Sequence, residues 1–122
     1  MPVTSAKLVE PLPSINLPQH EILEGQPSAG GQFTAESADR KACAGFWSCD
    51  VGRYEFHFGY DEFIYIVRGE VAVTELPERG ERGPGATCVL GPGDTAHFPQ
   101  GVTTIWEIRQ PLTKYFVARD PF

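Results

Sequence analysis

The residues best suited to chemistry lie in the middle of the chain, where carboxylate and imidazole side chains alternate with aromatic ones. Glu55 and His57 are interleaved with Tyr54, Phe56 and Phe58. Because successive side chains of a strand point to opposite faces, Glu55 and His57 share one face and the three aromatic residues share the other. A half-exposed strand would turn the two polar residues to water, whereas a barrel around a ligand cavity would turn them inward. The alternation alone leaves both arrangements open; the inward one would pack the aromatic face outward, against an arm or a second subunit.

Short strands must position these residues. The chain has 122 residues, of which 13 are glycine and 11 are proline, a composition that favours short strands joined by tight turns. Alternation and turn residues predict strands at 46–50, 53–58, 63–67, 70–76, 88–90, 95–98, 103–108 and 114–118. The third and fourth form a β-hairpin that turns at Gly69. No segment has the pattern of an amphipathic helix, so we predict an all-β sandwich or small barrel.

Composition excludes several classes of function. Ten basic and sixteen acidic residues give a net charge of −6, which argues against binding to nucleic acid or to an anionic membrane surface. The first 18 residues lack the basic and apolar regions of a secretion signal, and no window approaches the roughly 18 apolar residues of a membrane span. Cys43, Cys49 and Cys88 are odd in number and form no CxxC pair. We expect a cytoplasmic protein with reduced thiols in small packing positions.

The prolines divide the chain. Five of them fall within the first 27 residues, and none follows until Pro77. Because proline cannot donate to a sheet ladder, this head is expected to be extended, with at most one edge strand around residues 14–17. We therefore predict that residues 1–40 form an N-terminal arm that packs on a barrel or on a partner subunit, and that residues 41–122 form the domain itself.

Two spacings identify a family. Glu62 is followed after six residues by Gly69, and Gly93 is followed after five residues by Pro99, then one residue later by Gly101. In this order they resemble the two motifs of the cupin superfamily, whose fold is a small β-barrel of the jelly-roll type, also called a double-stranded β-helix. The stretch 45–115 is similar to small single-domain cupins related to the cupin domain of ureidoglycine aminohydrolase. The resemblance implies a cupin barrel over residues 41–122.

The resemblance also implies a metal site. In metal-binding cupins the first motif supplies two histidines one residue apart and then a glutamate, and the second motif supplies a third histidine. His57 and Glu62 match the second histidine and the glutamate, Glu55 stands in place of the first histidine, and Thr104 stands in place of the last. A hairpin turning at residues 99–102 would set His97 opposite Thr104. The ligand set Glu55, His57, Glu62 and His97 suits Mn(II), Fe(II) or Ni(II).

Each of these residues also has a simpler interpretation. His57 can be a pocket histidine that bonds to Glu55 or Glu62 with no metal present. Glu62 can be a solvated residue at the entry of a strand. His97 can line the pocket through a hydrogen bond without being a ligand. These alternatives remain open at the level of the sequence.

Substrate contacts are expected from five residues: Tyr65, His97, Thr104, Trp106 and Lys114. Trp106 lies two residues after Thr104 on the same strand face, so its indole can close the pocket over a flat or cationic ligand. Lys114 can act as an anion clamp; the alternative is a solvated charge. Most other aromatic residues are expected to be core or interface residues.

The resemblance leads to two functional hypotheses. In the first, His57 and Glu62, helped by Glu55, hold a divalent ion that polarises a small polar nitrogenous or carboxylated metabolite, and Glu55 or Glu62 acts as general base. Analogy with ureidoglycine aminohydrolase suggests hydrolysis. In the second, the barrel has lost the metal and binds a small ligand as a sensor or carrier without catalysis, for which Thr104 in place of the last ligand is the evidence.

A homodimer is expected from the apolar face predicted to point outward. Six residues contribute to this face: Tyr54, Phe56, Phe58, Phe63, Tyr65 and Val67. A monomer would leave such a surface partly exposed to water, whereas a second copy of the chain would cover it.

Overall fold

Nine β-strands make up the elements of the computed structural model, which describes residues 3–18, 21–25, 28–77 and 85–121. The strands are β1 (Ser14–Ile15), β2 (Ile22–Glu24), β3 (Ala29–Glu36), β4 (Ala42–Cys49), β5 (Gly52–His57), β6 (Asp61–Glu75), β7 (Thr87–Leu90), β8 (Thr95–Phe98) and β9 (Thr103–Arg119). The prediction of an all-β chain is confirmed. No helix in these ranges is long and apolar enough to cross a membrane.

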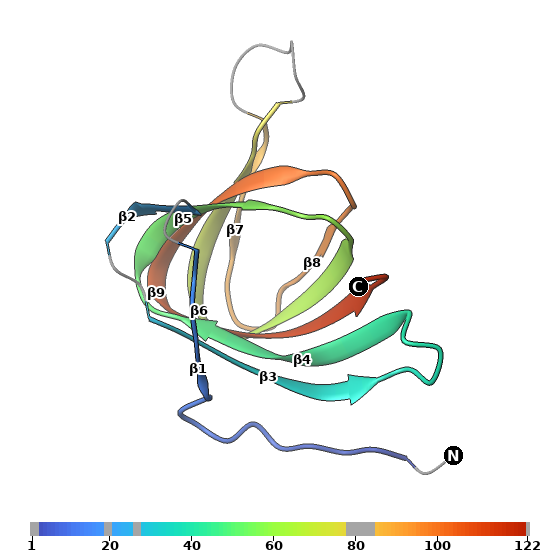
Figure 1. The fold of residues 1–122 in the computed structure, drawn as a ribbon. Coiled ribbons are helices and arrows are strands. Elements are labelled where there is room, and N and C mark those ends of the chain that lie inside the picture. The colour runs from blue at the N-terminus through green and yellow to red at the C-terminus, as the bar shows by residue number, and fades with distance from the viewer. Residues whose placement is uncertain (1–2, 19–20, 26–27, 78–84, 122) are drawn as a thin grey trace.

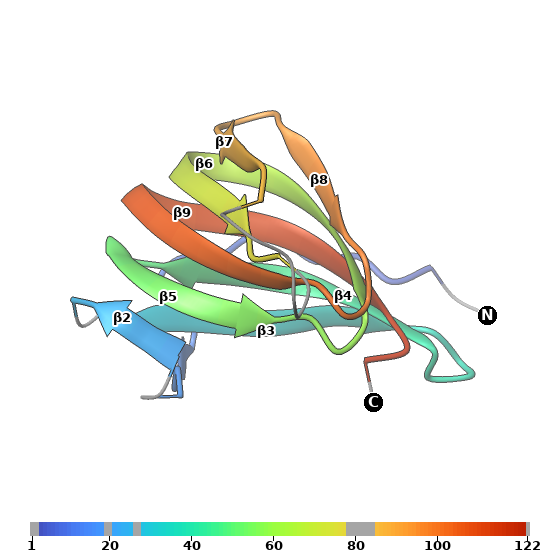
Figure 2. The same ribbon diagram turned by 90° about the horizontal axis from the view of Figure 1, so that it is seen from above.

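The two longest strands, β6 and β9, bend and connect two halves of one curled sheet. The first half of β6 pairs with β8 and with the second half of β9, which pairs with β4; β3 and β1 extend this side. The second half of β6 pairs with β7 and with the first half of β9, which pairs with β5 and, beyond it, β2. Figures 1 and 2 show how the two halves face each other around a common interior.

The bend in β6 lies at Gly69, where the sequence predicted a hairpin turn. That prediction is wrong: the chain continues as one strand whose register with β9 shifts between Ile66 and Val71. Gly69 has φ of +93°, and a Cβ atom there would lie 2.8 Å from the Cα atom of Leu112 in β9. A sharp bend and a hairpin turn both require a glycine after an apolar run, so the local sequence does not distinguish them.

The proline-rich head contains more pairing than expected. β1 pairs with β3 at one edge of the sheet and β2 pairs with β5 at the other, so the prediction of at most one edge strand is wrong. Proline shortens these ladders to two or three residues without preventing them. Within the predicted arm, β3 pairs along its length with β4 and belongs to the main sheet.

The orientation of β5 is the opposite of the one predicted. Tyr54 and Phe58 are 3% and 1% exposed, whereas Glu55 and His57 are exposed on the outer face. Burying a large apolar side chain gains about 1.5–3 kcal/mol, whereas burying a carboxylate without a partner costs free energy, and this difference sets the direction of the strand. The interior is consequently rich in stacked rings, such as Phe58 on Phe98 with centroids 4.6 Å apart.

The three cysteines are free thiols. Cys43 and Cys49 are buried in β4, in agreement with the small packing positions expected for them. Burial raises the pKa of the Cys49 thiol to about 12, and the nearby Asp50 carboxylate acts in the same direction. Cys88 is exposed on β7, so the packing prediction is wrong for that residue.

Candidate ligand pocket

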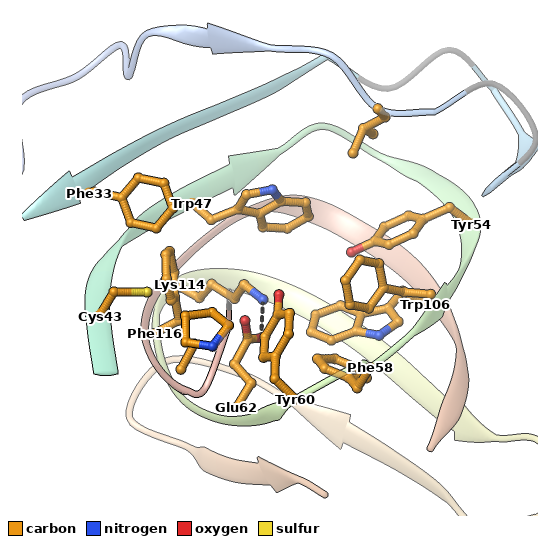
Figure 3. A pocket seen from close by; sticks show the side chains of 14 residues that line it. Phe33, Cys43, Trp47, Tyr54, Phe58, Tyr60, Glu62, Trp106, Lys114 and Phe116 are labelled. Atoms are coloured by element: carbon orange, nitrogen blue, oxygen red, sulfur yellow. Dashed lines mark hydrogen bonds and ion pairs between the residues drawn. The ribbon is translucent and has the colours of Figure 1, made fainter. Parts of the chain in front are cut away.

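A cavity of about 290 Å³ lies inside the curled sheet. Eight of the residues that line it are aromatic: Phe33, Trp47, Tyr54, Phe56, Phe58, Tyr60, Trp106 and Phe116. The others are Leu17, Cys43, Glu62, Lys114, Ala118 and Pro121. Two of these, Glu62 and Lys114, are charged. The cavity is therefore an aromatic chamber with an ion pair inside it (Figure 3).

Glu62 and Lys114 form a buried ion pair. Nζ of Lys114 donates a hydrogen bond to Oε2 of Glu62 at 2.9 Å, and the two side chains are 8% and 7% exposed. Alternation along β6 turns Glu62 inward with Ile64 and Ile66, and β9 lies directly beside it. Two charges removed from water are tolerated because each is the partner of the other. Figure 3 shows them meeting at the centre of the pocket.

Two indole rings hold the Lys114 ammonium in place. Its Nζ atom lies 4.9 Å from the ring centroid of Trp47 and 4.8 Å from that of Trp106. Both distances are within the range of a cation–π interaction. Trp106 is itself fixed, because its Nε1 donates to Oγ1 of Thr104 at 2.8 Å, and this hydroxyl donates to the carbonyl of Phe56 at 3.0 Å.

Two phenols complete the polar part of the pocket. Burial raises the pKa of Tyr54 well above its ordinary value of 10, with further increases from the charges of Cys49 and Glu62. Burial, and then the Glu62 carboxylate, raise the pKa of Tyr60 to about 12. Both phenols therefore keep their protons at neutral pH and can donate hydrogen bonds to a molecule in the cavity.

The structure brings three of the predicted site residues together in the pocket: Glu62, Trp106 and Lys114. Thr104 is fully buried and does not line the cavity, since its hydroxyl supports Trp106. The expectation that Thr104 contacts substrate directly therefore lacks support from the geometry.

The remaining predicted site residues lie on the outer surface. His57 is exposed on β5, where its Nδ1 is 2.8 Å from Oγ1 of Thr103, and Glu55 is exposed beside it. Tyr65 is 47% exposed on β6. His97 stacks on Phe63, with centroids 4.4 Å apart. The inward placement predicted for Glu55, His57 and His97 is wrong, whereas the outward direction of Tyr65 agrees with the apolar outer face predicted for it.

The position of His97 has a topological cause. The sequence predicted a hairpin in which the strand of His97 faces the strand of Thr104. Instead β8 pairs with β6, so that His97 lies opposite Phe63, while Thr104 pairs with Phe56 of β5. The turn at Pro99 and Gly101 thus carries the chain from one side of the curled sheet to the other.

Comparison with known proteins identifies this architecture. A model of the EutQ-like cupin domain matches residues 36–116. The chain belongs to the EutQ-like cupin family. A comparison with curated proteins found no significant match. The resemblance to small cupins and the prediction of a cupin barrel are confirmed.

Solved structures of other cupins share the fold. A DUF861 family protein from Thermotoga maritima is 28% identical, with a TM-score of 0.50, and the match covers 58% of this chain and 73% of that one. A protein from Salmonella typhimurium LT2, provisionally assigned as ethanolamine utilization protein Q, is 21% identical with a TM-score of 0.61, covering 79% and 71%. A DUF861 family protein of unknown function from Pseudomonas syringae pv. tomato has a TM-score of 0.72 at 17% identity, covering 86% of this chain and 43% of that one.

Cupins often bind metals, but the donor set in this pocket does not suit one. Of the four predicted ligands, Glu62 lines the cavity, whereas Glu55, His57 and His97 are exposed on the outside. The carboxylate of Glu62 faces an ammonium group, which repels a divalent cation. Within the described part of the chain, no three His, Cys, Asp or Glu side chains are grouped as metal ligands.

Sequence reasoning missed the aromatic wall of the pocket, above all Tyr60. A signal was available in the alternation of side chains, because every second residue from position 54 to position 62 lines the pocket: Tyr54, Phe56, Phe58, Tyr60 and Glu62. Glu55 is odd-numbered and Glu62 is even-numbered, so an alternation continued through this segment would place the two side chains on opposite faces. The assumption that Glu55 and Glu62 share a pocket ignored this rule.

On the outer surface, His97 and Asp61 form a pair whose titration can be measured. Nε2 of His97 lies 3.1 Å from Oδ1 of Asp61, and the hydrogen bond from this ring, followed by that of the Gln100 amide, lowers the pKa of Asp61 from 3.8. Any stability that the pair contributes is therefore present above pH 3.8 and is lost as the pH falls through the lowered pKa. We expect carbon NMR titration to give a midpoint below 3.8 for Asp61, and a higher midpoint in His97→Phe.

Asp39 provides the control for this titration. Its pKa is also lowered from 3.8, mainly by the hydroxyl of Ser37. The Asp39 midpoint should not move in His97→Phe. An unchanged Asp61 midpoint in that variant would show that the imidazole does not stabilise the carboxylate.

Proposed function

We propose that this cupin binds a small organic molecule in its aromatic pocket without a metal ion, as a sensor or carrier. The observation that carries the proposal is the Glu62–Lys114 pair, since a lysine ammonium accompanies the family glutamate at the centre of the cavity. The cavity is also of suitable chemistry, because small-molecule sites are mostly apolar with a few placed polar groups.

The alternative, a metal-dependent hydrolase, has less support from the geometry. It requires His57 to hold the ion and Glu55 to assist, and both residues are exposed on the outer face of β5. The remaining candidate base, Glu62, accepts a hydrogen bond from Lys114. Hydrolysis of a ureidoglycine-like substrate therefore rests on the family resemblance alone.

The two hypotheses differ in metal content and in sensitivity to chelator. Protein expressed in medium supplemented with Mn, Fe and Ni is expected to contain less than about a tenth of an ion per chain by elemental analysis. A panel of flat molecules of about ten non-hydrogen atoms, some anionic, some neutral and some cationic, should include one that raises the melting temperature by a few degrees. We expect this shift to persist in excess EDTA.

Filling the cavity provides the matched control. Ala118→Trp places a large side chain in the pocket wall and should abolish the thermal shift, whereas Ala42→Trp on β4 lies outside the pocket lining and should not. A stoichiometric ion that disappears in Glu62→Gln, or a ligand shift lost in EDTA, would favour the metal-dependent hydrolase instead.

We still propose a homodimer, with a smaller apolar contact surface than the sequence suggested. Tyr54, Phe56 and Phe58 line the pocket and cannot contribute to it. Phe63 and Tyr65 do point outward, each 47% exposed, with Val117 beside Phe63 in the ladder. We expect sedimentation at micromolar concentration to show a dimer and Phe63→Asp to shift it to monomer. Val51→Asp, at an exposed apolar residue elsewhere, should leave the dimer intact; a wild-type monomer would contradict the prediction.

We place the protein in the cytosol, as expected from the sequence. Cys43 and Cys49 are free thiols. A reducing compartment keeps such thiols unpaired.

A further inference from the structure

The charge balance of the pocket restricts the ligand it can take. One ammonium and one carboxylate lie 2.9 Å apart among the aromatic walls, so the chamber is electrically neutral as a whole. An anionic ligand at Lys114 would also approach Glu62, and a cationic ligand at Glu62 would also approach Lys114. In a pocket with few polar groups such repulsion is weakly screened, so an uncharged ligand is favoured.

The hydrogen-bonding positions that the ion pair leaves unused indicate which groups a ligand would carry. Oε2 of Glu62 accepts the hydrogen bond from Lys114, while its Oε1 has no donor among the described residues. Within those residues, no fully buried side-chain nitrogen or oxygen lacks a hydrogen-bond partner. Oε1 must therefore border open space, and the space beside Glu62 is the pocket. This atom can therefore accept a hydrogen bond from an N–H or O–H group of a ligand.

Donors lie next to that acceptor. An ammonium has three N–H groups, and Lys114 uses one on Glu62. The phenols of Tyr54 and Tyr60 are further donors on the pocket wall, and Figure 3 shows both hydroxyls directed into the pocket. A ligand that satisfies this arrangement presents a hydrogen-bond acceptor and a donor side by side.

The walls favour a flat molecule. Eight aromatic side chains line the cavity, and the contacts of Trp47, Tyr54 and Trp106 with one another, with centroids 5.9–6.3 Å apart, hold this part of the wall in place. Aromatic faces bind planar groups through stacking. A volume of 290 Å³ corresponds to roughly ten non-hydrogen atoms, if each occupies about the volume of a water molecule.

We infer that the ligand is an uncharged planar molecule that carries a carbonyl oxygen and an N–H group on one edge, as an aromatic amide or lactam does. The N–H donates to Oε1 of Glu62, and the carbonyl oxygen accepts from Lys114 or from a phenol. This inference rests on the proposed function, since it names the class of molecule that the metal-free pocket binds.

Four probes of nearly equal shape test the inference: benzamide, benzoate, benzamidine and acetophenone. The chain contains two tryptophans, and both line the pocket, so their indole N–H signals in nitrogen-15 NMR report binding directly. We expect benzamide to bind at least tenfold more tightly than the two charged probes. Acetophenone, which has a methyl group in place of the NH2 group of benzamide, should also bind at least tenfold more weakly than benzamide.

Two variants reverse the selectivity. Glu62→Gln gives the pocket a net positive charge and should prefer benzoate, whereas Lys114→Met gives it a net negative charge and should prefer benzamidine. If either variant fails to fold, the ranking of the four probes on the wild-type protein decides. Tightest binding of benzoate or benzamidine to the wild type, or equal binding of acetophenone and benzamide, would overturn the inference and leave the proposed function standing. Failure of every probe and of the wider panel would overturn both.

Discussion

Replacement of Lys114 by methionine is expected to lower the free energy of unfolding by about 3–5 kcal/mol at neutral pH, measured by urea denaturation. The variant keeps an unbranched side chain, one atom shorter than that of lysine, and removes its charge. Glu62, which is 5% exposed, then has no cationic partner, and its carboxylate stays buried among aromatic rings. The loss comes mainly from this unpaired charge and not from the attraction that the pair itself supplies.

The double variant Glu62→Met/Lys114→Met separates these two contributions. Because both charges are removed together, its stability should return to within about 1 kcal/mol of the wild type or exceed it, as for other buried pairs replaced by apolar residues. A matched pair on the surface gives the baseline: Arg40→Met removes the exposed partner of Glu36 and should change stability by less than about 1 kcal/mol. A Lys114→Met protein as stable as the wild type would mean that Glu62 is not buried in solution.

Gly69→Ala is expected to lower the free energy of unfolding by about 3 kcal/mol, the second largest effect we foresee. Two costs combine. Gly69 has φ of +93°, which an L side chain rarely adopts. In addition, the new Cβ would lie 2.8 Å from the Cα atom of Leu112 and against the carbonyl oxygen of Pro111. These are backbone atoms of the neighbouring strand, so they cannot move aside as a flexible side chain could.

Gly93 allows the two costs to be measured apart. It has nearly the same φ, +89°, but a Cβ atom there would meet nothing within 4 Å. Gly93→Ala should therefore show the conformational cost alone, about 1–2 kcal/mol. Equal losses in the two variants would show that β6 and β9 do not approach as closely at Gly69 as the structure indicates.

The barrel was predictable from the sequence because its signals are local. Turn residues at fixed spacings delimit the strands, and the spacing from Glu62 to Gly69 marks the first family motif. The pairing of strands was less predictable, because it depends on where the chain goes after each turn. The turn at Pro99 has the residues of a hairpin, yet the strands on either side of it, β8 and β9, pair with β6 and not with each other.

The site was predicted in part for the same reason. Glu62 is marked by its motif, and Lys114 by the family resemblance, and the structure brings them together. The faces of Glu55 and His57 were assigned by analogy with metal-binding relatives, against the free energy of burying three aromatic rings. The free energy of burying these rings depends on the whole interior of the barrel, and it determined the orientation of β5.

The pocket extends beyond the part of the chain that the family shares. The family match spans residues 36–116, and it contains the ion pair and both tryptophans. Leu17 and Phe33 precede that span, and Ala118 and Pro121 follow it, yet all four line the cavity. Substitutions in these terminal segments can therefore alter the pocket wall without altering the charged centre. New ligand preferences can evolve at the ends of the chain without any change in the barrel that holds the centre in place.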